Sequence, residues 1–92
     1  MIPASIEKTP DQRQAARILV VDDDPRLLSS LSSLLKQEGH DVTEAEGGRA
    51  ALRAIDSQSF DLAMLDLRMP EVDGFDVMAK LSKVQPDCGA IV

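Results

Sequence analysis

The sequence predicts an α/β protein with a mostly parallel sheet and helices on both of its faces. Short apolar runs alternate along the chain with segments whose apolar residues recur at helical spacing. The run at residues 18–21 is continuously apolar and branched, as in a strand that is buried on both faces. The resulting order, strand-helix-strand-helix-strand-helix-strand, is typical of βα units in a parallel sheet.

Length, net charge and the length of the apolar runs limit the classes of function that the chain can have. A chain of 92 residues is enough for one small domain. Its net charge of −6 argues against nucleic acid as a direct partner, because phosphate backbones bind basic surfaces. The apolar runs are too short to span a membrane and no secretory signal precedes them, so we expect a cytoplasmic protein without membrane contact.

Residues 1–16 are polar, contain two prolines and show no sustained period. We interpret them as a flexible leader. The domain then covers residues 17–92, and its pattern is incomplete at the C-terminus.

The first helix has clear start and stop signals. Asp24 suits the N-cap, Pro25 suits the first helical position, and Gly39 is placed to end the helix. Five leucines between them follow helical spacing and predict one apolar stripe: Leu27, Leu28, Leu31, Leu34 and Leu35.

The remaining elements follow in order. We expect a strand near residues 41–45, a turn at Gly47-Gly48, and a helix with Ala51, Leu52 and Ile55 on its inner side. A second buried strand covers residues 60–65, and Met69-Pro70 and Asp73-Gly74 mark a loop. The third helix is expected to carry Phe75, Val77, Met78 and Leu81, and residues 89–92 open a fourth strand.

Two single residues have ordinary interpretations. Cys88 is the only cysteine and has no partner for a disulfide or a metal motif, so we expect a small buried hydrophobe. His40 follows Gly39, away from the acids, and is expected at the surface.

Acidic residues follow two of the predicted strands. Asp22 and Asp23 come after the first strand, and Asp66 follows the third. If these strands are neighbours, the carboxylates converge at one edge of the sheet. Two carboxylates ~4 Å apart repel by roughly 4 kcal/mol at an effective dielectric of 20, so the free site should hold a proton or a cation. A hard divalent cation such as Mg²⁺ is the natural occupant, because it prefers oxygen ligands.

With these residues placed, the chain resembles a response-regulator receiver domain of two-component systems. The resemblance rests on ILVVDDDP at residues 18–25 and on MLDLRMPEVDG at residues 64–74. It implies a flavodoxin-like, doubly wound parallel sheet of order 2-1-3-4, with the fifth strand and the last helices missing.

The resemblance also implies roles for individual residues. Asp66 would accept the phosphoryl group as an aspartyl phosphate, in a magnesium-dependent reaction. Asp23, Asp66 and the backbone carbonyl of Arg68 would bind Mg²⁺ directly, and Asp22 would act mainly through metal-bound water. The donor would be a sensor histidine kinase or a phosphotransfer protein. The only chemistry of the domain itself would be to assist its own phosphorylation and dephosphorylation, so it is not expected to be an enzyme.

The family pattern extends beyond Val92. A Ser or Thr after the fourth strand and a Lys after a fifth strand are expected there, and neither Lys80 nor Lys83 is placed to substitute. If Val92 ends the molecule, the uncovered fourth strand would be an apolar edge, and we expect self-association through that edge or by exchange of elements. The alternative is that the sequence is a piece of a longer protein.

Two other functions compete with this interpretation. One is a receiver-like interaction or dimerisation module that is not switched. The other is a phosphohydrolase with an aspartate nucleophile, since Asp22 and Asp24 have Asp-x-Asp spacing, but Arg26 and the absence of a downstream lysine motif disfavour it.

Overall fold

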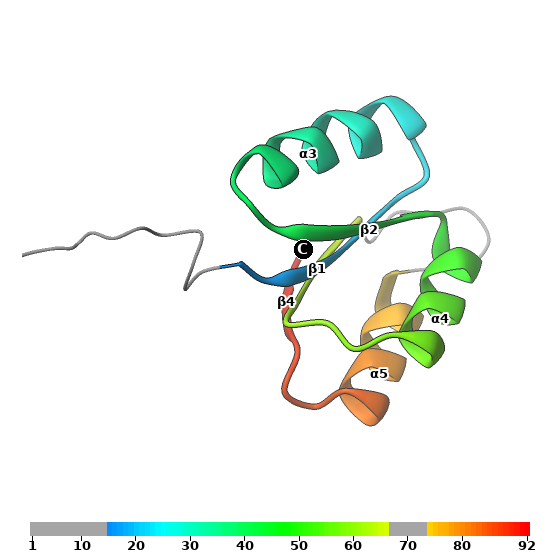
Figure 1. Cartoon of the computed structure of the whole chain (residues 1–92). Coiled ribbons are helices and arrows are strands. Elements are labelled where there is room, and N and C mark those ends of the chain that lie inside the picture. The colour runs from blue at the N-terminus through cyan, green and yellow to red at the C-terminus, as the bar shows by residue number, and fades with distance from the viewer. Residues whose placement is uncertain (1–14, 67–73) are drawn as a thin grey trace, which may run out of the picture.

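The computed structural model describes residues 15–66 and 74–92. Strands and helices alternate along this part of the chain (Figure 1). The elements are β1 (Arg17–Asp22), α3 (Pro25–Gln37), β2 (Asp41–Glu46), α4 (Gly48–Ser57), β3 (Leu62–Leu65), α5 (Gly74–Val84) and β4 (Gly89–Ile91). This order is the one that the sequence predicts.

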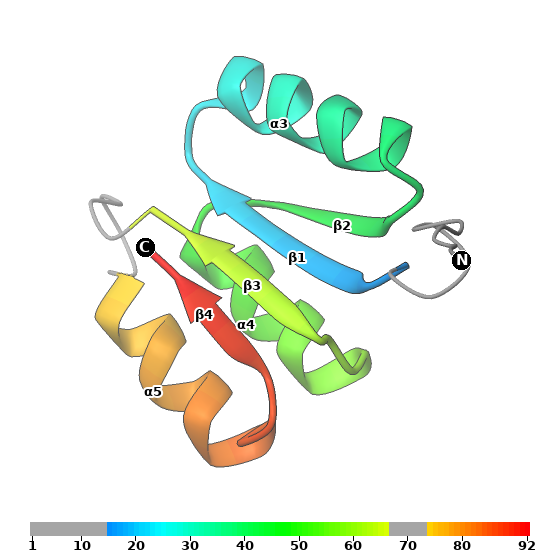
Figure 2. The ribbon, with the colours of Figure 1, turned by 90° about the vertical axis from the view of Figure 1, so that its left-hand side faces the viewer.

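The four strands form one parallel sheet in the order β2-β1-β3-β4 (Figure 2). β1 therefore pairs with β2 on one side and with β3 on the other. Helix α3 covers one face of the sheet, and α4 and α5 cover the other (Figure 1). The predicted strand order 2-1-3-4 and the helices on both faces are confirmed.

β1 is buried on both faces, and its side chains divide the interior into two cores. Leu19 and Val21 pack with residues of α4 and α5. Ile18 and Val20 pack with Leu28 of α3 on the opposite face. Because alternate residues of a strand point to opposite faces, a strand in this position needs four consecutive apolar residues.

Helix α3 starts and stops where the sequence predicts. The Asp24 side chain caps it by accepting a hydrogen bond from the amide of Arg26, with Pro25 next in the chain. Gly39 has a φ of 92°, a left-handed conformation that glycine adopts without strain, and its amide bonds the carbonyl of Lys36.

The predicted apolar stripe of α3 is only partly buried. Leu28 is buried, but Leu27 and Leu34 are each 59% exposed. The sequence predicts the apolar stripe, and the structure shows that these two residues of it remain exposed. The helix lies over β1 and β2, and the two leucines occupy its flank, which faces away from β2 toward β3 and β4.

Helix α5 carries the four predicted apolar residues, but they are not equally buried. Val77 and Leu81 are buried in the core, whereas Phe75 is 63% exposed. Lys80 of α5 forms an ion pair with Asp56 of α4, with 2.9 Å between Nζ and Oδ2. The two helices are thus connected by buried apolar contacts and by a surface ion pair.

Gln85, directly after α5, forms hydrogen bonds with three backbone groups. Its Nε2 donates to the carbonyls of Ile55 and Gln58, at 2.9 and 2.6 Å, and its Oε1 accepts from the amide of Phe60 at 2.8 Å. These groups lie in the last turn of α4 and in the connection that follows it. One amide side chain therefore satisfies backbone groups that the helix and the strand leave without partners.

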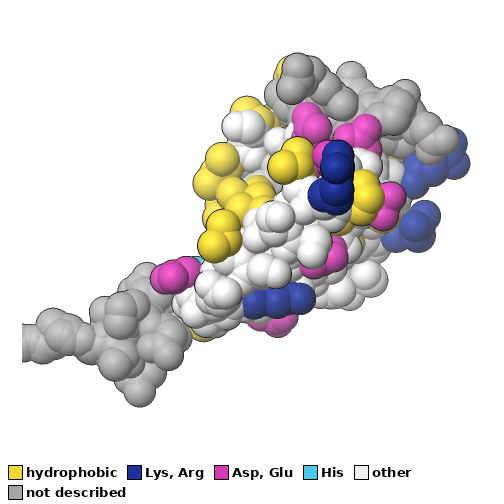
Figure 3. All heavy atoms as spheres, turned by 90° about the horizontal axis from the view of Figure 1, so that it is seen from above, with side chains coloured by type: hydrophobic (Ala, Val, Ile, Leu, Met, Phe, Trp, Pro, Cys, Tyr) yellow, Lys and Arg dark blue, Asp and Glu magenta, His cyan; other side chains and the backbone are white. Residues whose placement is uncertain are grey.

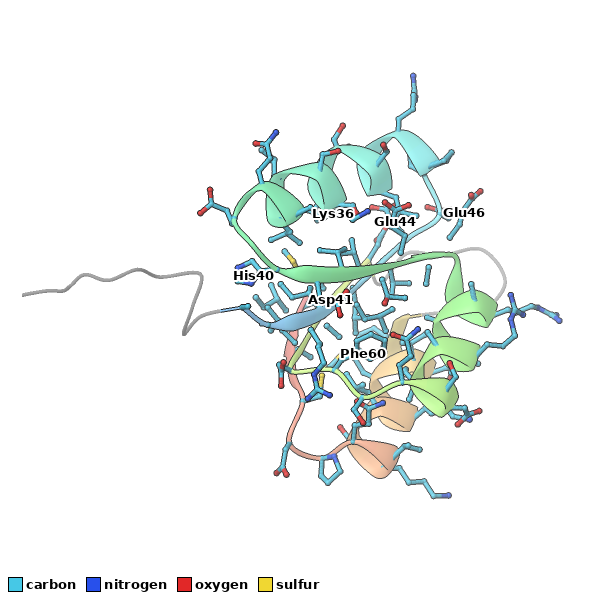
Figure 4. The ribbon with its side chains drawn as sticks, in the orientation of Figure 1. Lys36, His40, Asp41, Glu44, Glu46 and Phe60 are labelled. Carbon is cyan, nitrogen blue, oxygen red and sulfur yellow. The ribbon has the colours of Figure 1, made fainter. Side chains whose placement is uncertain are left out.

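Polar side chains close the amino end of the sheet. Arg17 and Asp61 form two side-chain hydrogen bonds, and these bonds lower the pKa of Asp61. His40 is half-buried, not fully at the surface as predicted, because its Nδ1 accepts the amide of Ala16 at 3.0 Å. Figure 4 shows His40 at this end of β2, with Glu46 at the opposite end.

Cys88 is half-buried and packs against the core that includes α4 and α5. Burial raises the pKa of its thiol. The prediction of a small hydrophobe agrees with this packing, although the side chain is not fully enclosed. Across residues 15–66 and 74–92, no helix combines the length and apolar character needed to cross a bilayer.

Replacing Gln85 with Ala should lower the free energy of unfolding by about 1–2 kcal/mol, because the amide of Phe60 and two carbonyls lose their partners. Urea denaturation monitored by circular dichroism measures this change. Gln37→Ala, at an exposed position of α3, is the matched control and should stay within ±0.5 kcal/mol. Equal effects of the two variants would contradict the role assigned to Gln85.

Ser32→Ala should stabilise the protein by about 1 kcal/mol. Ser32 is 1% exposed, and its hydroxyl finds no hydrogen-bond partner among the described residues, so removal of the hydroxyl abolishes a desolvation cost. Ser33→Ala, at an exposed neighbour, reports the gain from helix propensity alone. A shift in thermal midpoint no larger for Ser32→Ala than for Ser33→Ala would show that the buried hydroxyl is satisfied.

Candidate functional site

The parallel ladder brings the carboxyl ends of three strands to one edge of the sheet. Asp22, at the end of β1, is opposite Glu46 at the end of β2. On the other side, the ladder continues one residue beyond β3, where the amide of Asp66 donates to the carbonyl of Val21 at 3.1 Å. Asp66 is thereby held beside the end of β1.

Three carboxylates meet at this edge. One side-chain oxygen from each of Asp22, Asp23 and Asp66 lies within 4.8 Å of the other two. Asp22 and Asp66 are half-buried, whereas Asp23 is exposed. The convergence that the sequence predicts is therefore present in the structure.

The turn between β1 and α3 orients the first of these carboxylates. The Asp22 Oδ1 accepts the amide of Asp24 at 2.9 Å. The side chain of Asp24 in turn caps α3. The backbone carbonyl of Asp24 accepts a hydrogen bond from the amide of Leu28 at 3.0 Å. The start of α3 and the direction of the Asp22 side chain are thus set by the same short turn.

Gly47 supports the site from the β2 side. Its amide donates to the carbonyl of Asp22 at 3.1 Å, and its φ of 92° turns the chain into α4. No atom lies within 4 Å of where a Cβ would be, so glycine is favoured there by backbone conformation and not by lack of space. The sequence indicates the turn but not this contact with the acidic edge.

The carboxylates fit a small divalent cation. Unit charges 4.8 Å apart repel by about 1–3 kcal/mol between effective dielectrics of 80 and 20, and a cation removes this cost. Two oxygens bound to one Mg²⁺ lie at most about 4.2 Å apart, twice the metal–oxygen distance. Small side-chain rotations would therefore bring these oxygens to a shared ion.

Comparison with known proteins identifies the family. The profile of the response regulator receiver domain matches residues 18–92. The chain belongs to this family. Receiver domains are the regulatory phosphoacceptor modules of two-component signal transduction, and their partners are sensor histidine kinases.

Individual relatives agree with this assignment. The receiver is 44% identical over 77 residues to the transcriptional regulatory protein GlrR of Escherichia coli strain K12, covering 84% of the chain and 17% of GlrR. It thus spans about a sixth of that relative.

Solved structures are similar in sequence and in fold. The response regulator TrrA of Thermotoga maritima, in complex with Mg²⁺-BeF, is 38% identical with a TM-score of 0.77, covering 83% of the receiver and 66% of TrrA. A response regulator of Burkholderia pseudomallei with a phosphorylated aspartic acid, a calcium ion and citrate is 27% identical with a TM-score of 0.76. The match covers 80% of the receiver and 44% of that regulator.

The structure describes some of the site residues that the sequence predicts, and others lie outside its described part. The structure brings together Asp22, Asp23 and Asp66. Arg68, whose carbonyl was predicted as a ligand, lies outside the described residues, as does the predicted loop at Met69-Pro70. Gly74 begins α5, as expected for the end of that loop.

Asp24→Ala should destabilise the receiver by about 1 kcal/mol through loss of the α3 cap, and it should also weaken Mg²⁺ binding by loosening the turn that orients Asp22. Asp24→Asn keeps a capping oxygen and should retain most of the stability. Thermal unfolding with and without Mg²⁺ measures both effects. An unchanged Mg²⁺ response in Asp24→Ala would separate the cap from the metal site.

Proposed function

We propose that Asp66 is the phosphoacceptor of this receiver and that phosphorylation there controls an output. The observation that supports this proposal is the position of the Asp66 carboxylate. It is half-buried at the tip of β3, anchored by its own amide to β1, and within 4.8 Å of two further carboxylate oxygens.

In the proposed reaction, a carboxylate oxygen of Asp66 attacks the phosphorus of a phosphohistidine on a sensor kinase or a phosphotransfer protein. The new O–P bond gives an acyl phosphate, the N–P bond breaks, and the imidazole nitrogen keeps the electron pair. The same site would assist hydrolysis by water, which returns Asp66 to the free carboxylate. The activity of the domain is thus limited to its own phosphorylation and dephosphorylation.

Mg²⁺ fits this chemistry because it neutralises an acidic pocket that otherwise repels a phosphoryl dianion. We assign Asp23 and Asp66 as direct ligands, with the backbone carbonyl of Arg68 as a third. Asp22, whose Oδ1 already accepts the amide of Asp24, would act through a water molecule. Two solved relatives support this assignment, since one is a complex with Mg²⁺-BeF and the other holds a phosphorylated aspartic acid with a calcium ion.

A second candidate is a receiver-like module that associates without being switched. The observation that favours it is the exposure of β4, whose three residues are all exposed and which pairs only with β3 among the described strands. Such an edge presents unpaired backbone groups to another chain. Self-association through this edge, or by exchange of elements, would then be the function of the fold.

Intact-mass spectrometry after incubation with Mg²⁺ and acetyl phosphate distinguishes the two candidates. We expect a mass gain of one phosphoryl group, lost on chelation of Mg²⁺ and absent in Asp66→Asn. Asp76→Asn, an exposed acid in the first turn of α5, is the matched control and should keep the gain. No gain in a protein that still binds Mg²⁺ would favour the association module.

A further inference from the structure

Gly47 lies between the acidic edge and helix α4. It is half-buried, follows directly after β2, and is the N-cap residue of α4 without a side chain that could cap the helix. Its amide donates across to β1, where the carbonyl of Asp22 accepts the hydrogen bond at 3.1 Å. One backbone bond therefore connects the start of α4 with the residues of the proposed metal site.

The accepting carbonyl belongs to the peptide unit that joins Asp22 to Asp23. This unit carries two of the three converging carboxylates, one at each end. The preceding peptide unit is held from the other side of β1, where the amide of Asp66 donates to the carbonyl of Val21 at 3.1 Å. The bond from Gly47 therefore determines how the peptide between the two neighbouring aspartates is turned.

Electrostatic repulsion opposes this arrangement of the carboxylates. Acidic side chains gather around the start of α3 (Figure 3). Asp23 is exposed, so the backbone that carries it largely determines where its carboxylate lies. If the end of β1 were free, repulsion would turn the carboxylates apart, and a cation would have to draw them together again on binding. The hydrogen bond from Gly47 restrains this movement.

The backbone conformation of Gly47 directs its amide. Its φ is 92° and its ψ is 168°, a combination that is essentially restricted to glycine. A Cβ at this position would meet no atom within 4 Å. Alanine would therefore fit the space, but it would draw the backbone toward a negative φ and reorient the peptide that carries the amide.

We propose that Gly47 is a positioning residue for Mg²⁺ binding. Its amide holds the peptide between Asp22 and Asp23 in the orientation from which both carboxylates serve one cation, directly or through water. The inference rests on the proposed function, since it concerns the same metal site. The coupling is reciprocal: a cation that favours this orientation of the peptide also favours the hydrogen bond from Gly47 at the start of α4.

Gly47→Ala should weaken Mg²⁺ binding by about two- to tenfold, the factor that corresponds to one net hydrogen bond. Amide chemical shifts followed during titration with MgCl₂ measure the dissociation constant. The matched control is Gly39→Ala, because Gly39 has the same φ of 92° but lies before the opposite end of β2. This variant should also lower the midpoint of thermal unfolding, but it should keep the Mg²⁺ affinity of the wild-type protein.

Amide hydrogen exchange in the wild-type protein tests the coupling without a variant. Mg²⁺ should slow exchange at Gly47 more than at Asp41, whose amide bonds the carbonyl of Ala16 at 2.9 Å at the other end of β2. Equal Mg²⁺ affinities in the two glycine variants would overturn the inference, as would equal slowing at the two amides. A wild-type protein that does not bind Mg²⁺ would overturn the proposed metal site itself, and the inference with it.

Discussion

The structure depends on the parallel pairing of β1 with β2 and β3. Both edges of β1 are paired, and β1 is the described strand that supplies fully buried residues to both cores. Parallel pairing also makes neighbouring strands end at the same edge. The position of the acidic residues is therefore a consequence of how the sheet is assembled.

The acidic edge combines repulsion with local support. Carboxylates at this spacing repel each other, yet the surrounding backbone holds their positions through three hydrogen bonds. The amide of Asp66 bonds Val21, that of Gly47 bonds the Asp22 carbonyl, and that of Asp24 bonds the Asp22 side chain. Such preorganised carboxylates are suited to a divalent cation, since little rearrangement is needed to bind it.

Helix α3 connects the site with the rest of the surface. Its start is set by the turn that orients Asp22. Its leucines Leu27, Leu31 and Leu34 line an apolar groove that Asp22 and Asp66 also line. Events at the acidic edge and at the α3 flank are therefore structurally adjacent.

The sequence by itself determined the element order, the limits of α3 and the three acids at the strand ends, because these depend on local signals such as the apolar run 18–21 and the Asp24-Pro25 start. Only the tertiary structure decided that Leu27 and Leu34 remain exposed, that His40 accepts a hydrogen bond from the amide of Ala16, and that Gln85 bonds the backbone at the end of α4 and in the connection after it. The hydrogen bonds of His40 and Gln85 join residues 24 to 30 positions apart. Periodicity shows which side of a helix is apolar, but the neighbours that the fold supplies determine how much of that side is covered.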